Sequence, residues 1–121
     1  MPSRALEAAL ERPISEIKAD LFRALAHPAR IRALEVLTAG ERSVGEMVPL
    51  VGIEASHLSQ QLAVLRRAGV VTTRKDGNSV IYALRGPEVA ELLAVAKRLL
   101  INSLTESTAL LAGLRTAAGR R

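Results

Sequence analysis

The chain has 121 residues, which is enough for one domain around one hydrophobic core, and its 17 Lys and Arg against 12 Asp and Glu give a net charge of +5. It contains no cysteine, so disulfides, thiolate metal sites and thiol redox switches are excluded. With one Phe, one Tyr and no Trp, the core must be built from Leu, Val, Ile and Ala, which favours helices. No run approaches the roughly 18 apolar residues of a membrane span and no signal peptide is visible, so we expect a cytoplasmic protein without membrane contact.

Two helices are predicted in the first third of the chain. The first starts at Ser15, its capping residue, and ends before the His27-Pro28 pair. The second starts at Pro28 in a first-turn position and ends at Gly40. The apolar positions of the first helix, at helical spacing, are Ile17, Leu21, Phe22 and Leu25.

The next two predicted helices form a pair. Ser43 and Glu46 have the spacing of a capping box, which fixes the start of a third helix, and Pro49 predicts that this helix is short or kinked. A fourth helix spans about residues 54–68 and ends at Gly69. A short helix, a tight turn and a second helix form a helix-turn-helix, in which the second helix reads DNA.

A β-hairpin is predicted over about residues 70–84. Its two halves are β-branched and apolar, and Asp76-Gly77 between them is the strongest short hairpin signal in the chain. Two strands alone are marginally stable, so this hairpin must lean on the helices. It then serves as a wing, with Arg74, Lys75 and Asn78 near its tip and within reach of DNA.

One long helix is predicted over about residues 87–114, before a basic tail at residues 115–121. At 1.5 Å per residue it would be roughly 40 Å long, more than a small domain needs for its own core. Apolar residues cover more than one side of it, and this surplus predicts a homodimer. The predicted interface residues on this helix are Leu92, Leu93, Ala96, Leu100 and Leu104.

The helix at 54–68 has one apolar and one polar face. At 100° per residue its inward sector holds Leu58, Leu62 and Leu65, and its outward sector holds Ser56, Gln60, Ala63 and Arg67, with Ser59 and His57 at the margins. A solvated face usually carries Glu and Lys pairs, but this one has short hydrogen-bonding side chains. Such a surface suits a DNA groove, where Ser and Arg bind phosphate or base and Gln binds adenine.

Charge supports the same interpretation. Residues 54–85 carry five basic and two acidic side chains, and the tail carries three basic ones. A local basic surface beside a polar helix predicts a polyanion partner. The alternative is a basic surface that is simply solvated.

Three pieces of the sequence resemble the ArsR family of bacterial winged helix-turn-helix repressors. They are "LAHPARIRALEVL" (25–37), "GIEASHLSQQLAVLRRAGVV" (52–71) and "RKDGNSVIYAL" (74–84). The resemblance implies a mainly α fold of about five helices and a two-stranded wing, with the core at about 15–85 of a single domain, 1–121. It also implies a homodimer that binds a palindromic operator in double-stranded DNA.

The resemblance assigns roles to individual residues. Members of the family contact DNA through the positions held here by Ser56, His57, Ser59 and Gln60 and through the wing, and they dimerise through their first and last helices. This adds Leu21, on the first predicted helix, to the expected interface. The predicted DNA contacts are therefore Ser56, His57, Ser59, Gln60, Arg67, Arg74, Lys75 and Asn78.

The metal sites of the family do not carry over. In the cysteine-based sensors the ligands would fall on Ser43 and Gly45, and in the sensors with ligands on the last helix they would fall near Gly86, Glu88 and 99–102. None of these positions forms a plausible zinc or soft-metal cluster. His27, before Pro28, is expected to cap a helix end or to pack as a polar residue. We expect no metal and no cofactor, and the effector, a small molecule or a protein, is not identified.

The sequence also allows two other classes of function to be considered, a protein-interaction module and an enzyme. The long last helix could instead bind a different protein, with DNA binding secondary or lost. An enzyme finds little support, because the chain has no phosphate-binding glycine loop, no nucleophile elbow and no paired acids beside a histidine. No catalytic residue is predicted.

Overall fold

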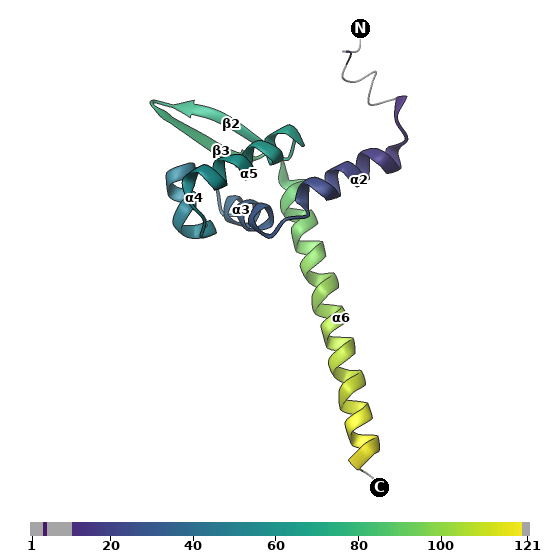
Figure 1. Cartoon of the computed structure of the whole chain (residues 1–121). Helices are drawn as coiled ribbons and strands as arrows, with labels where there is room; N and C mark the ends of the chain where they lie inside the picture. The colour runs from purple at the N-terminus through teal and green to yellow at the C-terminus, as the bar shows by residue number, and fades with distance from the viewer. Residues whose placement is uncertain (1–3, 5–10, 120–121) are drawn as a thin grey trace.

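The structure, a computed structural model, describes residue 4 and residues 11–119, with side chains as far as residue 114. The predicted mainly α fold with a β wing is confirmed, with five helices in the described part of the chain (Figure 1). The elements in chain order are α2 (Ile14–Leu25), α3 (Pro28–Thr38), β1 (Arg42–Ser43), α4 (Val44–Val51), α5 (Ala55–Arg67), β2 (Val71–Asp76), β3 (Ser79–Leu84) and α6 (Pro87–Gly119).

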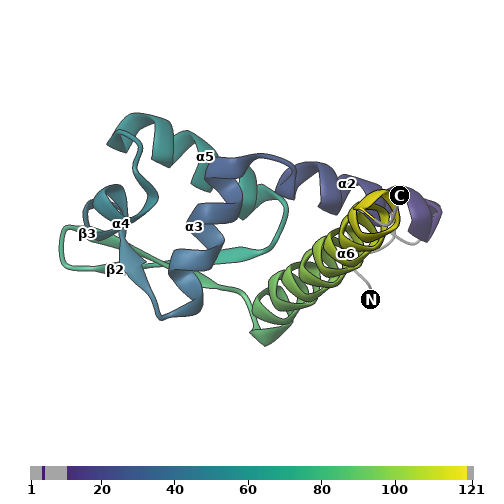
Figure 2. The ribbon, with the colours of Figure 1, turned by 90° about the horizontal axis from the view of Figure 1, so that it is seen from below.

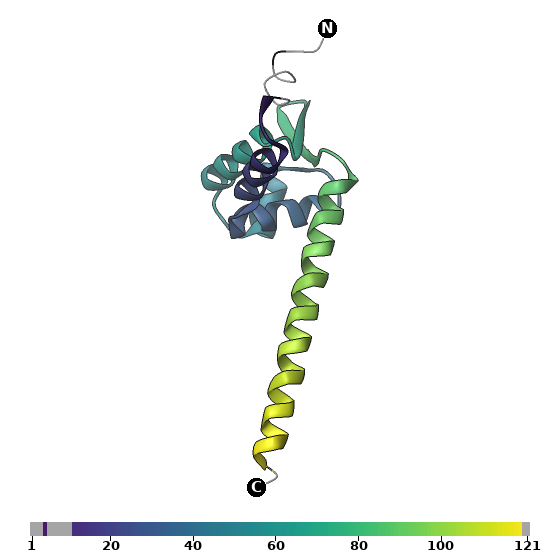
Figure 3. The ribbon, with the colours of Figure 1, turned by 90° about the vertical axis from the view of Figure 1, so that its right-hand side faces the viewer.

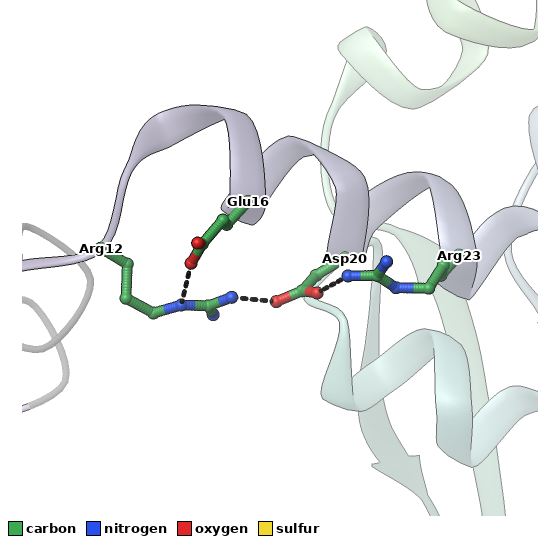
Figure 4. A network of polar contacts seen from close by, with 4 residues as sticks. All are labelled: Arg12, Glu16, Asp20 and Arg23. Atoms are coloured by element: carbon green, nitrogen blue, oxygen red, sulfur yellow. Dashed lines mark hydrogen bonds and ion pairs between the residues drawn. The ribbon is translucent and has the colours of Figure 1, made fainter.

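Helix α2 differs from the prediction at its start. The predicted cap at Ser15 is wrong: the helix begins one residue earlier, Pro13 is the N-cap, and no side chain caps it. Ion pairs hold the first turns instead, because Arg12 reaches Glu16 at 3.8 Å and Asp20 at 2.7 Å, and Arg23 also binds Asp20 (Figure 4). The hydrogen bond from Arg23, and then that from Arg12, lowers the pKa of Asp20.

The next two helices start with side-chain caps. His27 is the N-cap of α3, and its Nδ1 accepts the Ala29 N–H at 3.0 Å. The predicted capping box of α4 is confirmed: Ser43 Oγ accepts the Glu46 N–H at 3.2 Å, and the Ser43 N–H donates to Glu46 Oε1 at 3.0 Å. Helix α4 has eight residues and contains Pro49, in line with the short helix that the proline predicts.

The core lies where α3, α4 and α5 meet the sheet. Figure 2 shows α3 in the centre of the domain, with α4, α5 and α6 around it. Fully burying one leucine side chain stabilises a fold by about 1.5–3 kcal/mol. Phe22, grouped with the apolar positions of the first helix, is 55% exposed and stays outside this core. The largest fully buried side chains are Leu34, Met47, Leu58, Leu62, Leu65 and Val71.

The sheet has one strand more than predicted. The hairpin of β2 and β3 is present, but β1 pairs antiparallel with β3, which gives the order β1-β3-β2. Two residues connect the hairpin, and Gly77, the first of them, has a φ of +62°, as a type II′ turn requires. The third strand supports the hairpin, because β1 pairs with β3 and leads directly into α4, which connects the sheet to the helices.

Helix α6 runs far beyond the rest of the domain. Its 33 residues correspond to about 50 Å, and the views of Figures 1 and 3 both show it leaving the body of the domain. Neither α6 nor any other described helix is long and apolar enough to cross a membrane. The side chains of the predicted basic tail, 115–121, lie outside the described residues.

Candidate nucleic-acid interface

Helices α4 and α5 form the predicted helix-turn-helix. Gly52 ends α4 with a φ of +83°, a left-handed conformation that favours glycine, and its N–H donates to the Val48 carbonyl at 2.9 Å. Two more residues complete the turn before α5 begins at Ala55. Helix α5, Ala55–Arg67, is called the reader helix below.

The reader helix is fixed on one side and free on the other. Leu58, Leu62 and Leu65 are completely buried, which fixes the rotation of the helix about its own axis. Ser56, Ser59, Gln60 and Arg67 are all exposed, so the structure places these four predicted DNA contacts in solvent. The Ser56 hydroxyl donates to Glu54 Oε1 at 3.0 Å, a contact at the surface that DNA can replace.

His57 has a different environment from the other predicted contacts. It is half-buried, and its ring stands edge-on to that of His27, with the centroids 6.3 Å apart. Because His27 caps α3, the first turn of the reader helix packs against the start of α3 at this point. Only part of the His57 side chain is open to a ligand.

The end of the reader helix is joined to the wing. The Gly69 and Val70 N–H groups return to the carbonyls of Arg66 and Leu65, a Schellman motif with Gly69 at a φ of +80°. Arg85, at the end of β3, donates from Nε to the Gly69 carbonyl at 2.6 Å. The wing therefore has a fixed position relative to the reader helix.

The three predicted contacts on the wing are exposed but not equivalent. Arg74 and Lys75 are neighbours on β2, so their side chains leave opposite faces of the hairpin. Arg74 makes a bidentate ion pair with Glu41. The hydrogen bond from the guanidinium lowers the pKa of Glu41. Lys75 has no acidic partner among the described residues, and Asn78 lies in the turn at the tip.

Sequence reasoning missed two arginines of α3 that make hydrogen bonds between helices. Arg30 donates from Nε to Gln61 Oε1 on the reader helix at 2.8 Å and from Nη1 to the Ala24 carbonyl of α2 at 3.1 Å. Arg32 donates from Nε to the Val51 carbonyl at the end of α4 at 3.1 Å. No local sequence signal points to these contacts, because the residues they join are 6 to 31 positions apart.

The residues expected at a dimer interface do not all share one environment. Leu21, Leu92 and Leu93 are half-buried against their own domain, whereas Leu100 and Leu104 are 63% and 67% exposed and Ala96 is exposed as well. Leu93, Ala96, Leu100 and Leu104 border an open apolar groove of about 800 Å³ between α3 and α6. On the α3 side this α3–α6 groove is bordered by Ile31, Glu35 and Thr38.

Metal-binding side chains are scattered in the part of the chain that the structure describes. No three of its His, Cys, Asp and Glu side chains come close enough together to hold an ion. His27 and His57 are the only histidines of the chain, and the first uses Nδ1 as a helix cap. The described surface offers hydrogen-bonding and basic groups for a polyanion rather than a ligand set for a metal.

Comparison with known proteins identifies relatives with this arrangement. A family model described as "Bacterial regulatory protein, arsR family" matches residues 27–73, from the cap of α3 into β2. The HTH-type transcriptional regulator Rv0081 of Mycobacterium tuberculosis is 55% identical over 104 residues, which are 85% of this chain and 91% of the relative. The biofilm growth-associated repressor of Agrobacterium fabrum is 42% identical over 85 residues, 70% of this chain and 72% of the relative.

Solved structures show the same fold. The crystal structure of Rv0081 superposes with a TM-score of 0.75 at 54% identity, covering 80% of this chain and 98% of that one. A homodimeric winged helix-turn-helix domain from Mycobacterium bovis, solved by NMR, has a TM-score of 0.70 at 28% identity and covers 87% and 93% of the two chains.

Proposed function

Because this chain belongs to the arsR family of bacterial regulatory proteins and is a DNA-binding transcriptional regulator, we propose that it is a repressor that binds a palindromic operator as a homodimer. The observation that carries the proposal is the reader helix: three completely buried leucines hold an outer face of Ser56, Ser59 and Gln60 in solvent. The protein acts by binding and not by catalysis, in the bacterial cytoplasm where promoter DNA lies.

The exposed side chains divide into two roles. Gln60 can donate and accept in one plane, which matches the edge of adenine in the major groove, and Ser56 and Ser59 can bind a base or a phosphate. Arg67, Lys75, Arg74 and Asn78 bind the backbone around the groove, and His57 makes an edge contact from its half-buried position. Base contacts give sequence preference, and phosphate contacts give affinity that falls with salt.

The second copy of the chain occupies the exposed side of α6. Along this helix Leu93, Leu100, Leu104, Leu111 and Leu114 lie in one stripe with alternating steps of three and four residues, and Lys97 and Ser107 complete the pattern. This is the spacing of a helix that pairs with another helix. The outer leucines are more than half exposed in the single chain, which leaves the stripe open for a partner.

Charge favours an antiparallel pair of α6 helices. In a parallel pair, Lys97 would lie opposite the partner's Lys97 inside the interface between the two α6 helices, where two like charges are unfavourable. With the helices antiparallel and Leu100 beside the partner's Leu104, Lys97 lies beside Ser107 and Leu93 beside Leu111. The partner's Leu111 and Leu114 then enter the α3–α6 groove, which the single chain leaves open.

The test of this function has two parts. An operator is first selected from a random duplex library with the full chain, and its affinity is compared with that of a scrambled duplex at several salt concentrations. We expect a preference for the selected duplex and a linear fall of log affinity with log salt. A reporter under the bound promoter should rise when the regulator is deleted. Equal affinity for both duplexes would refute the DNA-reading role, and a reporter that falls would refute repression.

A further inference from the structure

One side chain joins α2, which carries the predicted dimer contact Leu21, to the predicted reader helix. Arg30, on α3, is half-buried and gives its Nε–H to Gln61 on the reader helix. Its Nη1 donates to the carbonyls of Ala24 and Arg23, at 3.1 and 3.4 Å, in the last turn of α2. The Arg23 carbonyl also accepts the Ala26 N–H at 3.2 Å, so it is the Ala24 carbonyl, one of the last-turn groups without a partner in its own helix, that the guanidinium satisfies while it holds Gln61.

Leu25 of α2 is buried in the core with the leucines of the reader helix, but the junction between the two helices is open farther along α2. Ile17 and Leu21 of α2 face Arg67 and Ala68 at the end of the reader helix across an open groove of about 390 Å³. Apolar packing therefore anchors α2 at Leu25 and constrains the angle between the two helices less along the rest of α2. The planar guanidinium, with donors in fixed directions, sets that angle better than a flexible ammonium could.

We infer that Arg30 is a positioning residue that sets the distance and the angle between the two reader helices of the dimer. The inference rests on the proposed function, because it needs a dimer held through α2 and α6 and two half-sites in the operator. Gln61 is the neighbour of Gln60, the predicted base reader, so a shift of Gln61 also moves the side chain that contacts the bases.

The spacing of the half-sites measures this role directly. Inserting one base pair moves a half-site by about 3.4 Å and turns it by about 34–36° around the DNA axis. A dimer with a fixed angle between its helices tolerates this change poorly. A dimer whose reader helices can swing tolerates it better, although it binds the correct spacing less tightly.

The experiment uses the selected operator, the same operator with one central base pair inserted or removed, and a duplex with a single half-site. We expect Arg30→Met to reduce the preference for the correct over the altered spacing by roughly tenfold, the scale of one lost hydrogen bond to a charged donor. Binding to the single half-site should stay within about twofold of wild type, because the reader face itself is intact.

Three further variants separate positioning from folding. Gln61→Met removes only the hydrogen bond between Arg30 and the reader helix. We expect it to lower the spacing preference as much as Arg30→Met does, and the double variant should show no further loss. Arg30→Lys should restore little, since one ammonium replaces two directed donors. Arg32→Met, the matched control, removes an arginine-to-carbonyl bond of the same helix at the end of α4, and should leave the spacing preference unchanged.

The outcomes distinguish the inference from the proposed function. If the wild-type chain itself shows no preference for an operator, the proposed function fails. If the wild-type chain prefers the correct spacing but Arg30→Met and Gln61→Met retain that preference, the inference alone fails. A loss by the same factor on all four duplexes, with a lowered unfolding temperature, would show Arg30 to be merely structural and would also overturn it.

Discussion

Replacing Leu104 by alanine should weaken the dimer by a factor that follows from its exposure. The substitution deletes three carbon groups, each contributing about 0.8 kcal/mol when buried. In the single chain Leu104 is 67% exposed, so about two thirds of that contribution, roughly 1.6 kcal/mol, depends on the partner. Because the dimer is two-fold symmetric, it contains this contact twice. The substitution should therefore weaken dimerisation by about 3 kcal/mol and raise the dimer Kd about 200-fold.

Sedimentation equilibrium over a range of protein concentrations measures this Kd directly. The matched control is Leu50→Ala, the same deletion at a leucine of α4 that is 57% exposed but lies away from α6. The control should dimerise like the wild-type chain. If Leu104→Ala dimerises as tightly as Leu50→Ala does, the partner does not cover this part of α6, and the proposed interface is wrong.

Five other changes test the remaining steps. Because the chain has no cysteine, Leu93→Cys combined with Leu111→Cys should form an intermolecular disulfide on oxidation while Leu111→Cys alone should not; crosslinking of the single variant would indicate a parallel pair. Gln60→Ala should lower operator affinity by about 1–3 kcal/mol and leave random duplex nearly unaffected, whereas Lys75→Ala should weaken both alike and reduce the salt slope by about 1 in fluorescence titrations. Glu41→Gln should strengthen binding to random duplex, because it frees Arg74 from its ion pair; unchanged affinity would show that Arg74 does not contact DNA. Leu62→Ala should lower the free energy of unfolding by about 2–5 kcal/mol in urea, and a loss below about 1 kcal/mol would contradict its place in a dry core.

The features predicted from the sequence are those with local causes. The leucine spacing of residues 58–65 fixes which side of the reader helix is buried, the Ser43 and Glu46 pair fixes the start of α4, and Asp76-Gly77 marks the hairpin. Each of these signals depends only on residues within about one or two helical turns of one another, so it does not depend on how the rest of the chain folds.

The features that were missed depend on contacts between distant parts of the chain. The strand β1 has only two residues, and it exists because β3 offers a free edge to Arg42 and Ser43. The partner of Arg74 is Glu41, 33 positions away, and the partner of Arg30 on the reader helix is 31 positions away. Arginine has no strong local preference that would reveal such a role, so only the packed fold selects these pairs.

The segment at Ser43–Gly45 has a structural role in this chain. The ArsR resemblance places the ligands of cysteine-based sensors at these two positions, but here Ser43 pairs with Ile81 in the sheet and exchanges two hydrogen bonds with Glu46. The hydrogen bond that the Ser43 backbone N–H gives to the Glu46 carboxylate, and then the interaction with the Ser43 hydroxyl, lowers the pKa of Glu46 and so keeps the carboxylate charged for the capping box. The donor atoms of this segment thus hold the start of α4 in place. A change at the proposed dimer interface would reach the reader helix through α3, because α3 borders the α3–α6 groove and its Arg30 binds Gln61 of the reader helix.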